Sequence, residues 1–385
     1  MLKKKLIRIT TIPLSLEKLL EGQLSFMSRY FEVIAISSDV ARLKAYADNE
    51  GIRCHPLELT RKITPIKDLL AVWKLYRFLK REQPFIVHTH TPKAGIVGMM
   101  AAWLAKVPHR LHTVAGLPLM EATGFKKKLL VYIEKRTYRY ATKVFPNSKG
   151  LMEYIISEKL VAPSKLYIVG KGSSNGIDTS FFNPVHFGEN DRVELKTSLG
   201  IPQKDFVFLF VGRIVKDKGI VEMVDAFINL LATHPHSSLL LVGPSEPDLD
   251  PLPETTEKTI HSHPKIFSVG FQEDVRPYFA VSHVLVFPSY REGFPNVVMQ
   301  AGAMGIPCIV SNINGCNEIV TDGLNGLIIP VKNVNALHAA MDALLREGAL
   351  YGKLVAESRG AIVSRYERHE IWRALLGVYQ NLEDS

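Results

Sequence analysis

Two stretches of the sequence bring together residue types that bind phosphates and sugar hydroxyls. In FVGRIVKDKGI, residues 210–220, an apolar run ends at Gly212 and is followed at once by Arg213, Lys216 and Lys218. Arginine offers phosphate oxygens a fork of hydrogen-bond donors and lysine offers a point charge, so this spacing is typical of a diphosphate clamp. Taken alone, a run of charges more often marks a solvated loop.

The second stretch, REGFPNVVMQAGAMGIPCIV at residues 291–310, places a carboxylate beside a predicted helix start. Glu292 and Gly293 follow an apolar strand pattern, Pro295 can open a helix, and Gly305 fits the position just past its end. The unpaired N–H groups of a helix start favour an anion, and a nearby carboxylate can accept hydrogen bonds from hydroxyls. On these residues alone, an ordinary strand, turn and helix with a surface glutamate is an equally good interpretation.

The elements that must position these loops alternate between strands and helices. β-rich runs in the first half are KLIRIT, EVIAIS, FIVHTH, RLHTVA, KVFPNS and LYIVG, and those in the second half are DFVFLFVGR, SSLLLVG, KIFSVG, HVLVFPS, PCIVS and NGLIIP. Helical patterns such as Pro65–Arg81 and Ala94–Val107 lie between them. The alternation predicts α/β domains with doubly wound parallel sheets, whose ligands bind at the carboxyl ends of the strands.

A stretch without periodicity separates the two halves. Residues 172–190, GSSNGIDTSFFNPVHFGEN, are rich in Gly, Ser and Asn and are typical of a linker. We therefore expect a first domain over residues 1–180 and a second over 181–365, facing each other across a cleft. A final helix at about 366–385 should pack back on the first domain.

Composition limits the class of protein. The chain has 385 residues, 46% hydrophobic and 22% charged, which predicts a folded protein of two domains. The net charge of +9 suits an anionic partner, but no nucleic-acid-binding motif is present, so we expect no nucleic acid. Three cysteines without a Cys-x-x-Cys pair indicate a reducing compartment, and the apolar runs are too short to cross a membrane. We expect a cytoplasmic protein that can lie peripherally on the inner face of the cell membrane.

Together, the motifs resemble those of a known enzyme family. The pair GR…KG, followed by REGFPNVVMQAGAMGIPCIVSNINGCNEIVTDGLNGLIIP, resembles the retaining family 4 glycosyltransferases of the GT-B fold, over nearly the whole chain. IVHTHTPKAGIVGMMAA, TVAGLP, KVFPNS and GSSNGID are similar to the same family, especially to enzymes that build bacterial surface polysaccharides. The resemblance implies transfer of a sugar from a nucleotide diphosphate sugar, which we expect to be UDP-linked. The acceptor would be a carbohydrate or a glycan linked to a polyprenyl diphosphate.

The resemblance also implies roles for individual residues. Arg213 and Lys218 would hold the donor diphosphate and stabilise its charge as it leaves, and Glu292 would contact hydroxyls of the transferred sugar. No metal and no other cofactor would be needed, because side-chain cations and a helix dipole can offset that charge. The remaining donor-binding residues lie in the loop after Glu292, on the following helix and in the NGID loop: Gly293, Phe294, Pro295, Asn296, Gln300, Asn175 and Gly176.

Two positions depart from the family pattern. The family usually has a second glutamate where this chain has Gln300, and an amide can still bind the ribose hydroxyls. Many relatives carry a histidine in place of Ala115, near the C6 hydroxyl of the donor sugar, so its loss predicts a 6-deoxy donor. We expect His88, His90, Thr91 and Ala115 to line the acceptor side. The two histidines share a strand face, but no third ligand lies nearby, so we predict no metal.

A basic amphipathic stretch predicts contact with a membrane. GFKKKLLVYIEKRTYRYATK, residues 124–143, interleaves Lys and Arg with Phe125, aliphatic residues and three tyrosines. A helix of this type can lie on an anionic membrane, with Lys3, Lys4 and Lys5 adding to the same surface. The alternative is a solvated helix face over its own core.

Four other functions fit parts of the sequence. A nucleotide-sugar epimerase or a phosphorylase of the same fold would need residues that the sequence does not identify. A nucleic-acid-binding protein would explain the charge but lacks a motif. A sugar-nucleotide sensor without catalysis is suggested by Gln300 and Ala115. Turnover with a correct donor and acceptor separates the sensor from the transferase.

Overall fold

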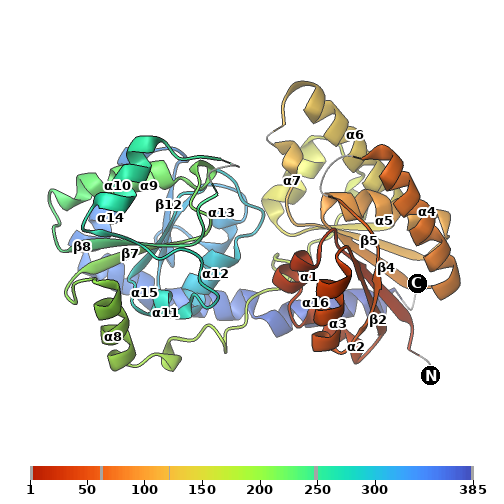
Figure 1. The fold of residues 1–385 in the computed structure, drawn as a ribbon, viewed down its shortest axis with the longest axis horizontal. Helices are drawn as coiled ribbons and strands as arrows, with labels where there is room; N and C mark the ends of the chain where they lie inside the picture. Colours follow the sequence, from red (N-terminus) through yellow and green to blue (C-terminus); the bar gives the residue numbers. More distant parts are fainter. Residues whose placement is uncertain (1–2, 61–63, 121, 247–249, 383–385) are drawn as a thin grey trace. The chain divides into compact units, whose positions relative to one another are not determined.

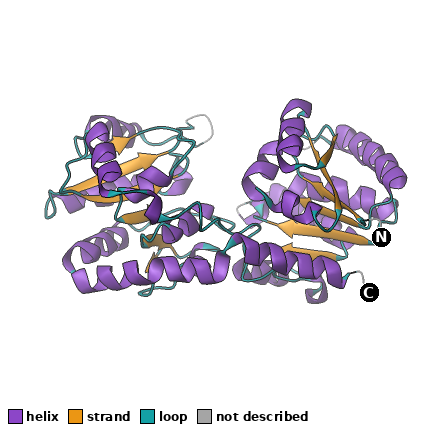
Figure 2. Cartoon of the chain, turned by 90° about the horizontal axis from the view of Figure 1, so that it is seen from below, coloured by secondary structure: helices purple, strands orange, loops and turns teal. Residues whose placement is uncertain are grey.

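The structure is a computed structural model that describes residues 3–60, 64–120, 122–246 and 250–382. The chain divides into two compact units, one of Met1–Gly176 with Arg368–Ser385 and one of Ile177–Glu367. From the sequence, we expect the first domain to end at residue 180 and the final helix to begin at about residue 366. Each unit is a parallel sheet with helices on both faces, as Figures 1 and 2 show.

The first unit is built on a sheet of six parallel strands in the order β3-β2-β1-β4-β5-β6. In its register, Ile7 lies between Ile34 and Val87, and these buried side chains belong to one apolar cluster. The strands are β1 (Lys5–Ile9), β2 (Glu32–Ser37), β3 (Arg53–Pro56), β4 (Ile86–His90), β5 (His109–Val114) and β6 (Lys143–Pro146).

Two layers of helices cover this sheet, and each shares an apolar cluster with one of its faces. One layer contains α4 (Pro65–Glu82), α5 (Pro92–Leu104), α6 (Gly124–Tyr140) and α7 (Lys149–Ser157). The other contains α1 (Pro13–Leu19), α2 (Gln23–Ser28), α3 (Val40–Glu50) and α16 (Arg368–Asn381). The final helix of the chain therefore packs in the first unit, through Leu375, Leu376 and Tyr379.

The second unit has a sheet of six parallel strands in the order β12-β11-β10-β7-β8-β9. Its strands are β7 (Phe206–Val211), β8 (Ser237–Val242), β9 (Ile266–Ser268), β10 (Val284–Phe287), β11 (Cys308–Ser311) and β12 (Gly326–Ile329). Its helices are α8 (Glu189–Leu199), α9 (Ile220–Leu231), α10 (Glu254–Ser262), α11 (Arg276–Ala280), α12 (Asn296–Ala303), α13 (Cys316–Ile319), α14 (Val334–Arg346) and α15 (Gly348–Tyr366).

Strand order locates the place where each sheet can bind a ligand. When the strands are numbered within their own unit, both sheets have the order 3-2-1-4-5-6. In such sheets the order of the strands reverses between the first and fourth strands, and ligands bind outside the carboxyl ends of these strands. The switch point lies between β1 and β4 in the first unit and between β7 and β10 in the second.

Most of the predicted elements are confirmed, and one is wrong. All six runs in the second half form strands, and Pro65–Arg81 is helical as α4. LYIVG does not form a strand, because only Leu166 bridges to Val144 and the chain then turns away. Strand β3 could not be predicted from the sequence, because its four residues RCHP carry no apolar alternation and end in proline.

Buried histidines make the stability of the fold depend on pH. Burial lowers the pKa of His112 to about 4, and it also lowers the pKa of His283 to about 4. His283 lies at the start of β10, where its Nδ1 accepts a hydrogen bond from the backbone N–H of Val207 at 2.9 Å. This contact requires an unprotonated Nδ1, so the neutral ring is the form that the fold holds.

We expect His283→Asn to weaken the acid sensitivity of the fold. An unfolded histidine titrates near pH 6.5. As the pH falls below that value, the unfolded wild-type chain binds a proton at residue 283, whereas His283 in the folded chain stays neutral. Wild type should therefore lose up to about 1.4 kcal/mol of unfolding free energy per pH unit more than the variant. Urea unfolding of both proteins at about pH 7.5 and about pH 5.5 measures this difference. Equal losses in the two proteins would show that His283 does not contribute.

Candidate active site

The loops after β7 and β10 meet at the switch point of the second sheet. The loop after β7 contains Arg213 and a short 3-10 turn, Lys216–Lys218, before Gly219 opens α9. The loop after β10 runs beside this turn, because the backbone N–H of Tyr290 donates to the carbonyl of Asp217 at 2.9 Å. The two motifs singled out in the sequence are therefore neighbours in space.

Lys218 and Glu292 form the centre of this site. The Lys218 ammonium lies 2.5 Å from Glu292 Oε1, which also accepts a hydrogen bond from the Ser289 hydroxyl at 3.0 Å. The two side chains are only 14% and 16% exposed. Within the described residues, Glu292 Oε2 makes no hydrogen bond. One oxygen of the carboxylate is thus fixed by the protein, while the other remains available to a ligand hydroxyl.

Two other basic side chains of the site are also held by carboxylates, whereas the exposed Lys216 side chain makes no ion pair within the described residues. Arg213 Nη1 donates to Glu246 at 2.9 Å, and Arg291 Nη2 donates to Asp217 at 2.8 Å. The hydrogen bond that Arg213 donates to Glu246 raises the pKa of Arg213, and the nearby charges of Asp217 and Glu292 act in the same direction. Arg213 keeps 39% of its side chain exposed, so a phosphate could replace Glu246 as its partner.

A third strand end, that of β11, fixes the Glu292 loop from the side. The Asn314 side-chain amide donates to the Gly293 carbonyl at 2.9 Å. Gly315 has φ +77°, and a Cβ built on it would lie 2.4 Å from that same carbonyl. This stretch, NINGC, has no predicted role from the sequence. An Asn-Gly pair shortly after an apolar strand is typical of a turn and could have pointed to this loop.

Helix α12 begins just beyond this loop. Pro295 has an extended backbone and is the N-cap, so the helix starts at Asn296, one residue later than expected. Phe294 points into the core, where its ring packs on Tyr366 at 5.4 Å between centroids. Only the backbone of Phe294 can face a ligand. Asn296 is exposed, and Gln300 is half-buried on the same helix, with no hydrogen bond from its side chain within the described residues.

In the first unit, Thr91 marks the switch point between β1 and β4. Thr91 follows β4 directly, and its hydroxyl lies 2.7 Å from the hydroxyl of Thr11, which follows β1. Its φ is +74°, which is rare for a β-branched residue and stores strain. Ala115 is half-buried just after β5, and its carbonyl accepts a hydrogen bond from the Asn147 amide at 3.4 Å.

His88 and His90 lie beneath this edge rather than on it. Both rings are 1% exposed and they stack with centroids 4.7 Å apart, so they do share a strand face. Arg8, fully buried, lies 2.6 Å from His90 Nε2, while His88 Nδ1 lies 2.6 Å from the Tyr379 hydroxyl. Burial lowers the pKa of both histidines well below the usual range. They cannot touch an acceptor directly in this structure, and a part in shaping that surface stays a prediction.

Asn175 and Gly176, the last residues before the second unit, belong to the first. The Asn175 Oδ1 accepts hydrogen bonds from Trp372 Nε1 at 2.6 Å and from the Gln23 amide at 3.0 Å. The Asn175 side chain is therefore occupied in holding α2 and α16 together. A contact of the Asn175–Gly176 backbone with the donor stays a prediction.

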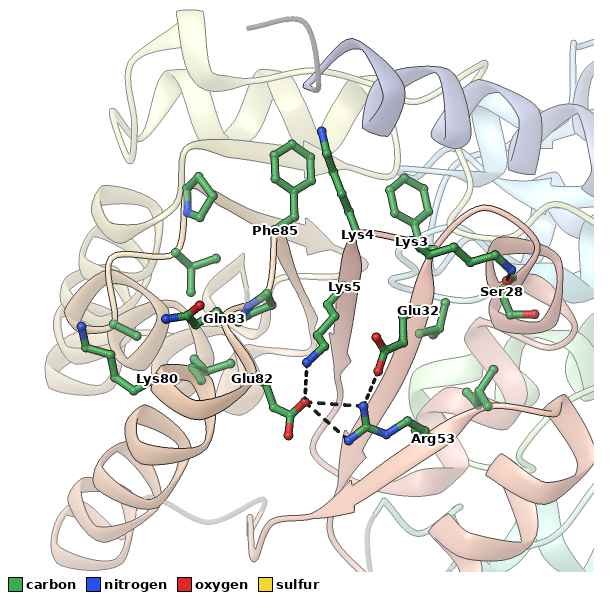
Figure 3. A pocket seen from close by; sticks show the side chains of 18 of the residues that line it. Lys3, Lys4, Lys5, Ser28, Glu32, Arg53, Lys80, Glu82, Gln83 and Phe85 are labelled. Atoms are coloured by element: carbon green, nitrogen blue, oxygen red, sulfur yellow. Dashed lines mark hydrogen bonds and ion pairs between the residues drawn. The ribbon is translucent and has the colours of Figure 1, made fainter. Parts of the chain in front are cut away.

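A wide depression lies at the opposite, amino-terminal edge of the first sheet, with a volume of about 1060 Å³ (Figure 3). Its floor is an ion-pair network in which Glu82 binds Lys5 at 3.0 Å and Arg53 at 3.4 Å. Lys3 and Lys4 line the same depression. These lysines therefore gather around this depression, and no α6 residue is among those that line it.

The described residues contain neither a metal-ligand cluster nor a helix that could span a membrane. Within residues 3–60, 64–120, 122–246 and 250–382, no group of three or more His, Cys, Asp or Glu side chains could hold a metal ion. Across the same part of the chain, no helix combines the length and apolar character needed to cross a bilayer.

Comparison with known proteins identifies the family. Residues 191–360 match the family described as "Glycosyl transferases group 1", and residues 27–172 match the "Glycosyl transferase 4-like domain". The chain is 31% identical over 380 residues to the capsular polysaccharide biosynthesis glycosyltransferase CapM of Staphylococcus aureus, covering 98% of this chain and 97% of that protein. It is also 31% identical to the UDP-Gal:alpha-D-GlcNAc-diphosphoundecaprenol alpha-1,3-galactosyltransferase of Escherichia coli, over 82% of this chain and 80% of that protein.

A solved structure shows the same fold. HepE of Anabaena, crystallised with UDP and glucose, matches with a TM-score of 0.81 at 16% identity, covering 98% of this chain and 100% of that one. The fold is thus GT-B, with two Rossmann-like domains. The chain belongs to the group 1 glycosyl transferases. It is a glycosyltransferase enzyme.

Proposed function

We propose that this enzyme transfers a sugar, with retention of configuration, from a UDP-linked donor to a lipid-linked glycan during surface polysaccharide assembly. The Lys218–Glu292 pair beside Arg213, at the switch point of the second sheet, is the observation that carries the proposal. The named activities of the two relatives support it, since one makes capsular polysaccharide and the other uses UDP-Gal and a diphosphoundecaprenol acceptor.

Arg213, Lys218 and Glu292 have different roles in the proposed reaction. Arg213 exchanges Glu246 for the donor diphosphate, and Lys218 supplies a second positive charge close to it. Glu292 Oε2 accepts hydrogen bonds from hydroxyls of the transferred sugar. The acceptor hydroxyl oxygen bonds to the anomeric carbon as the bond from that carbon to the diphosphate oxygen breaks, and its proton passes to the leaving phosphate. The cations stabilise the departing charge, so the reaction proceeds without a metal.

Two substitutions bear on the choice of donor. Gln300 would meet the ribose hydroxyls with an amide, which both donates and accepts hydrogen bonds. Ala115, lacking a polar side chain, would leave the C6 position of the donor without a partner, which favours a 6-deoxy sugar. A donor panel in which every ordinary hexose is used better than its 6-deoxy analogue would overturn this part of the proposal.

Contact with an anionic membrane forms part of the same proposal. The outer face of α6 carries Phe125, Lys128, Tyr132, Lys135 and Arg139, all exposed. Lys127 instead pairs with Glu158, and the aliphatic side chains of the helix are half-buried. This helix therefore contributes charge and two aromatic rings, which suit electrostatic attraction to anionic lipids.

Nucleotide binding tests the donor site. We expect UDP to raise the melting temperature in the presence of EDTA, and we expect Arg213→Ala to remove most of that shift. A ligand at about a hundred times its Kd adds about 2.7 kcal/mol to the unfolding free energy. GDP, ADP and TDP serve as competitors for the assignment of the base. Lys204→Ala, an exposed lysine at the other end of β7, should respond like wild type. No shift with any nucleotide would show that the clamp is misassigned.

A further inference from the structure

Helix α4 has two apolar faces. One face, with Ala71, Val72, Leu75, Phe78 and Leu79, is buried in the core of the first unit. On the other, Ile66 is 79% exposed, Leu69 61%, Leu70 54% and Trp73 54%. The spacing of these four residues, three or four apart, places them on one side of the helix over its first two turns.

Three cationic residues of α4 lie on the same side of the helix as its exposed apolar residues. Arg77, Lys80 and Arg81 continue the exposed side over the last two turns, and Arg77 lies over the Trp73 ring at 4.9 Å. The two carboxylates of the helix are already bound, since Asp68 pairs with Lys93 at 2.5 Å and Glu82 pairs with Lys5. The exposed side is therefore apolar at its start, where the exposed Lys67 and Lys74 flank it, cationic at its end and without a free carboxylate.

An exposed cluster of large apolar side chains on one helix usually marks a contact surface. We propose that this side of α4 lies on an anionic bilayer, with Ile66, Leu69, Leu70 and Trp73 inserted at the boundary between headgroups and acyl chains. The cationic turns then meet the lipid phosphates, and their aliphatic stems lie over the apolar boundary. The inference rests on the proposed function, because a lipid-linked acceptor holds the enzyme at that surface.

Charge favours lipid over a second copy of the chain as the occupant. Two copies joined through this face would bring a strongly cationic surface against its own duplicate. An anionic bilayer satisfies both halves of the helix, the apolar start by insertion and the cationic end by attraction. Helices α4 and α6 both pack on α5 in the same layer, so the cations of α6 can contribute to the same attraction (Figure 1).

The test measures vesicle binding of the full chain. Sedimentation with vesicles of phosphatidylcholine and phosphatidylglycerol should show binding by wild type and at least about a tenfold weaker partition for Leu69→Ser/Trp73→Ser, a loss equal to about 1.4 kcal/mol. Vesicles of phosphatidylcholine alone should bind much less. The matched control is Val185→Ser/Phe271→Ser, which removes two apolar side chains that are 76% and 71% exposed in the second unit, and it should bind like wild type.

Two further readouts separate the possible results. The UDP-induced shift in melting temperature should be the same in both variants, so loss of vesicle binding with that shift intact is a failure of membrane docking and not of the donor site. Equal vesicle binding by Leu69→Ser/Trp73→Ser and wild type would overturn the proposal. A change of oligomeric state in that variant, with vesicle binding unchanged, would overturn it in favour of a second copy of the chain.

Discussion

Replacing Lys218 by methionine should lower turnover by about 10²- to 10³-fold, the range seen when one preorganised donor is removed from a site of developing charge. Methionine keeps the length and apolar stem of lysine but removes its charge. That charge lies 2.5 Å from Glu292 Oε1 and, in the proposed mechanism, close to the diphosphate that gathers negative charge as it leaves. The effect should fall more on kcat than on KM, because the diphosphate charge is largest in the transition state.

The control for this variant is Lys204→Met, which removes an exposed lysine ahead of β7 and should turn over like wild type. Melting temperatures of both variants show whether the fold is intact. A folded Lys218→Met enzyme with wild-type kcat would contradict the role given to this residue. A rise in KM with kcat unchanged would restrict Lys218 to binding the substrate in its ground state.

Adding a single methyl group at Gly315 should reduce kcat/KM by about 10²-fold, although Gly315 itself touches no substrate. The new Cβ would lie 2.4 Å from the Gly293 carbonyl and 3.0 Å from Phe294 Cα, and φ is +77°. Real Cβ atoms do not tolerate such distances, so the loop that carries Glu292 must move. Steady-state kinetics of Gly315→Ala, with urea unfolding to follow stability, measures the effect.

Gly305→Ala separates the clash from the backbone strain. Gly305 follows α12 with φ +78°, but no atom lies within 4 Å of its built Cβ. This variant should lose about 1 kcal/mol of unfolding free energy from the left-handed backbone and keep its activity. If Gly315→Ala and Gly305→Ala have equal kcat/KM, the position of the Glu292 loop is not set by Gly315.

The sequence could predict that the two candidate donor-binding loops lie together, because each of them directly follows its strand. Arg213 and Lys218 follow β7, Glu292 follows β10, and parallel strands bring such loops to one edge. The sequence could not predict which side chains form the hydrogen bonds that position Glu292 and Gly293. Asn314 reaches Gly293 only because β10 and β11 are neighbours in the sheet, and Ser289 reaches Glu292 through a turn within the loop after β10.

The errors have similar physical causes. LYIVG has the composition of a strand, but the sheet already ends at β6, and Leu166 finds only one bridge there. His88 and His90 lie beneath the sheet edge, which alternation along a strand could not reveal, and their part in shaping the acceptor side stays a prediction. Pro65–Arg81 is predicted from the sequence as an amphipathic helix, which leaves open how its apolar residues are divided between the core and the surface. Only the structure shows that four large apolar side chains of α4 are exposed.

The most direct test of the whole account is the stereochemistry of transfer in the presence of EDTA. The enzyme would be incubated with UDP-sugars, including 6-deoxy sugars, and with a polyprenyl-diphosphate-linked sugar, and the new linkage would be assigned by NMR. The proposed mechanism predicts an α-linked product that keeps the configuration of the donor, formed at the same rate with and without the chelator. An inverted β-linkage, or transfer that stops in EDTA and returns on addition of a divalent cation, would contradict it.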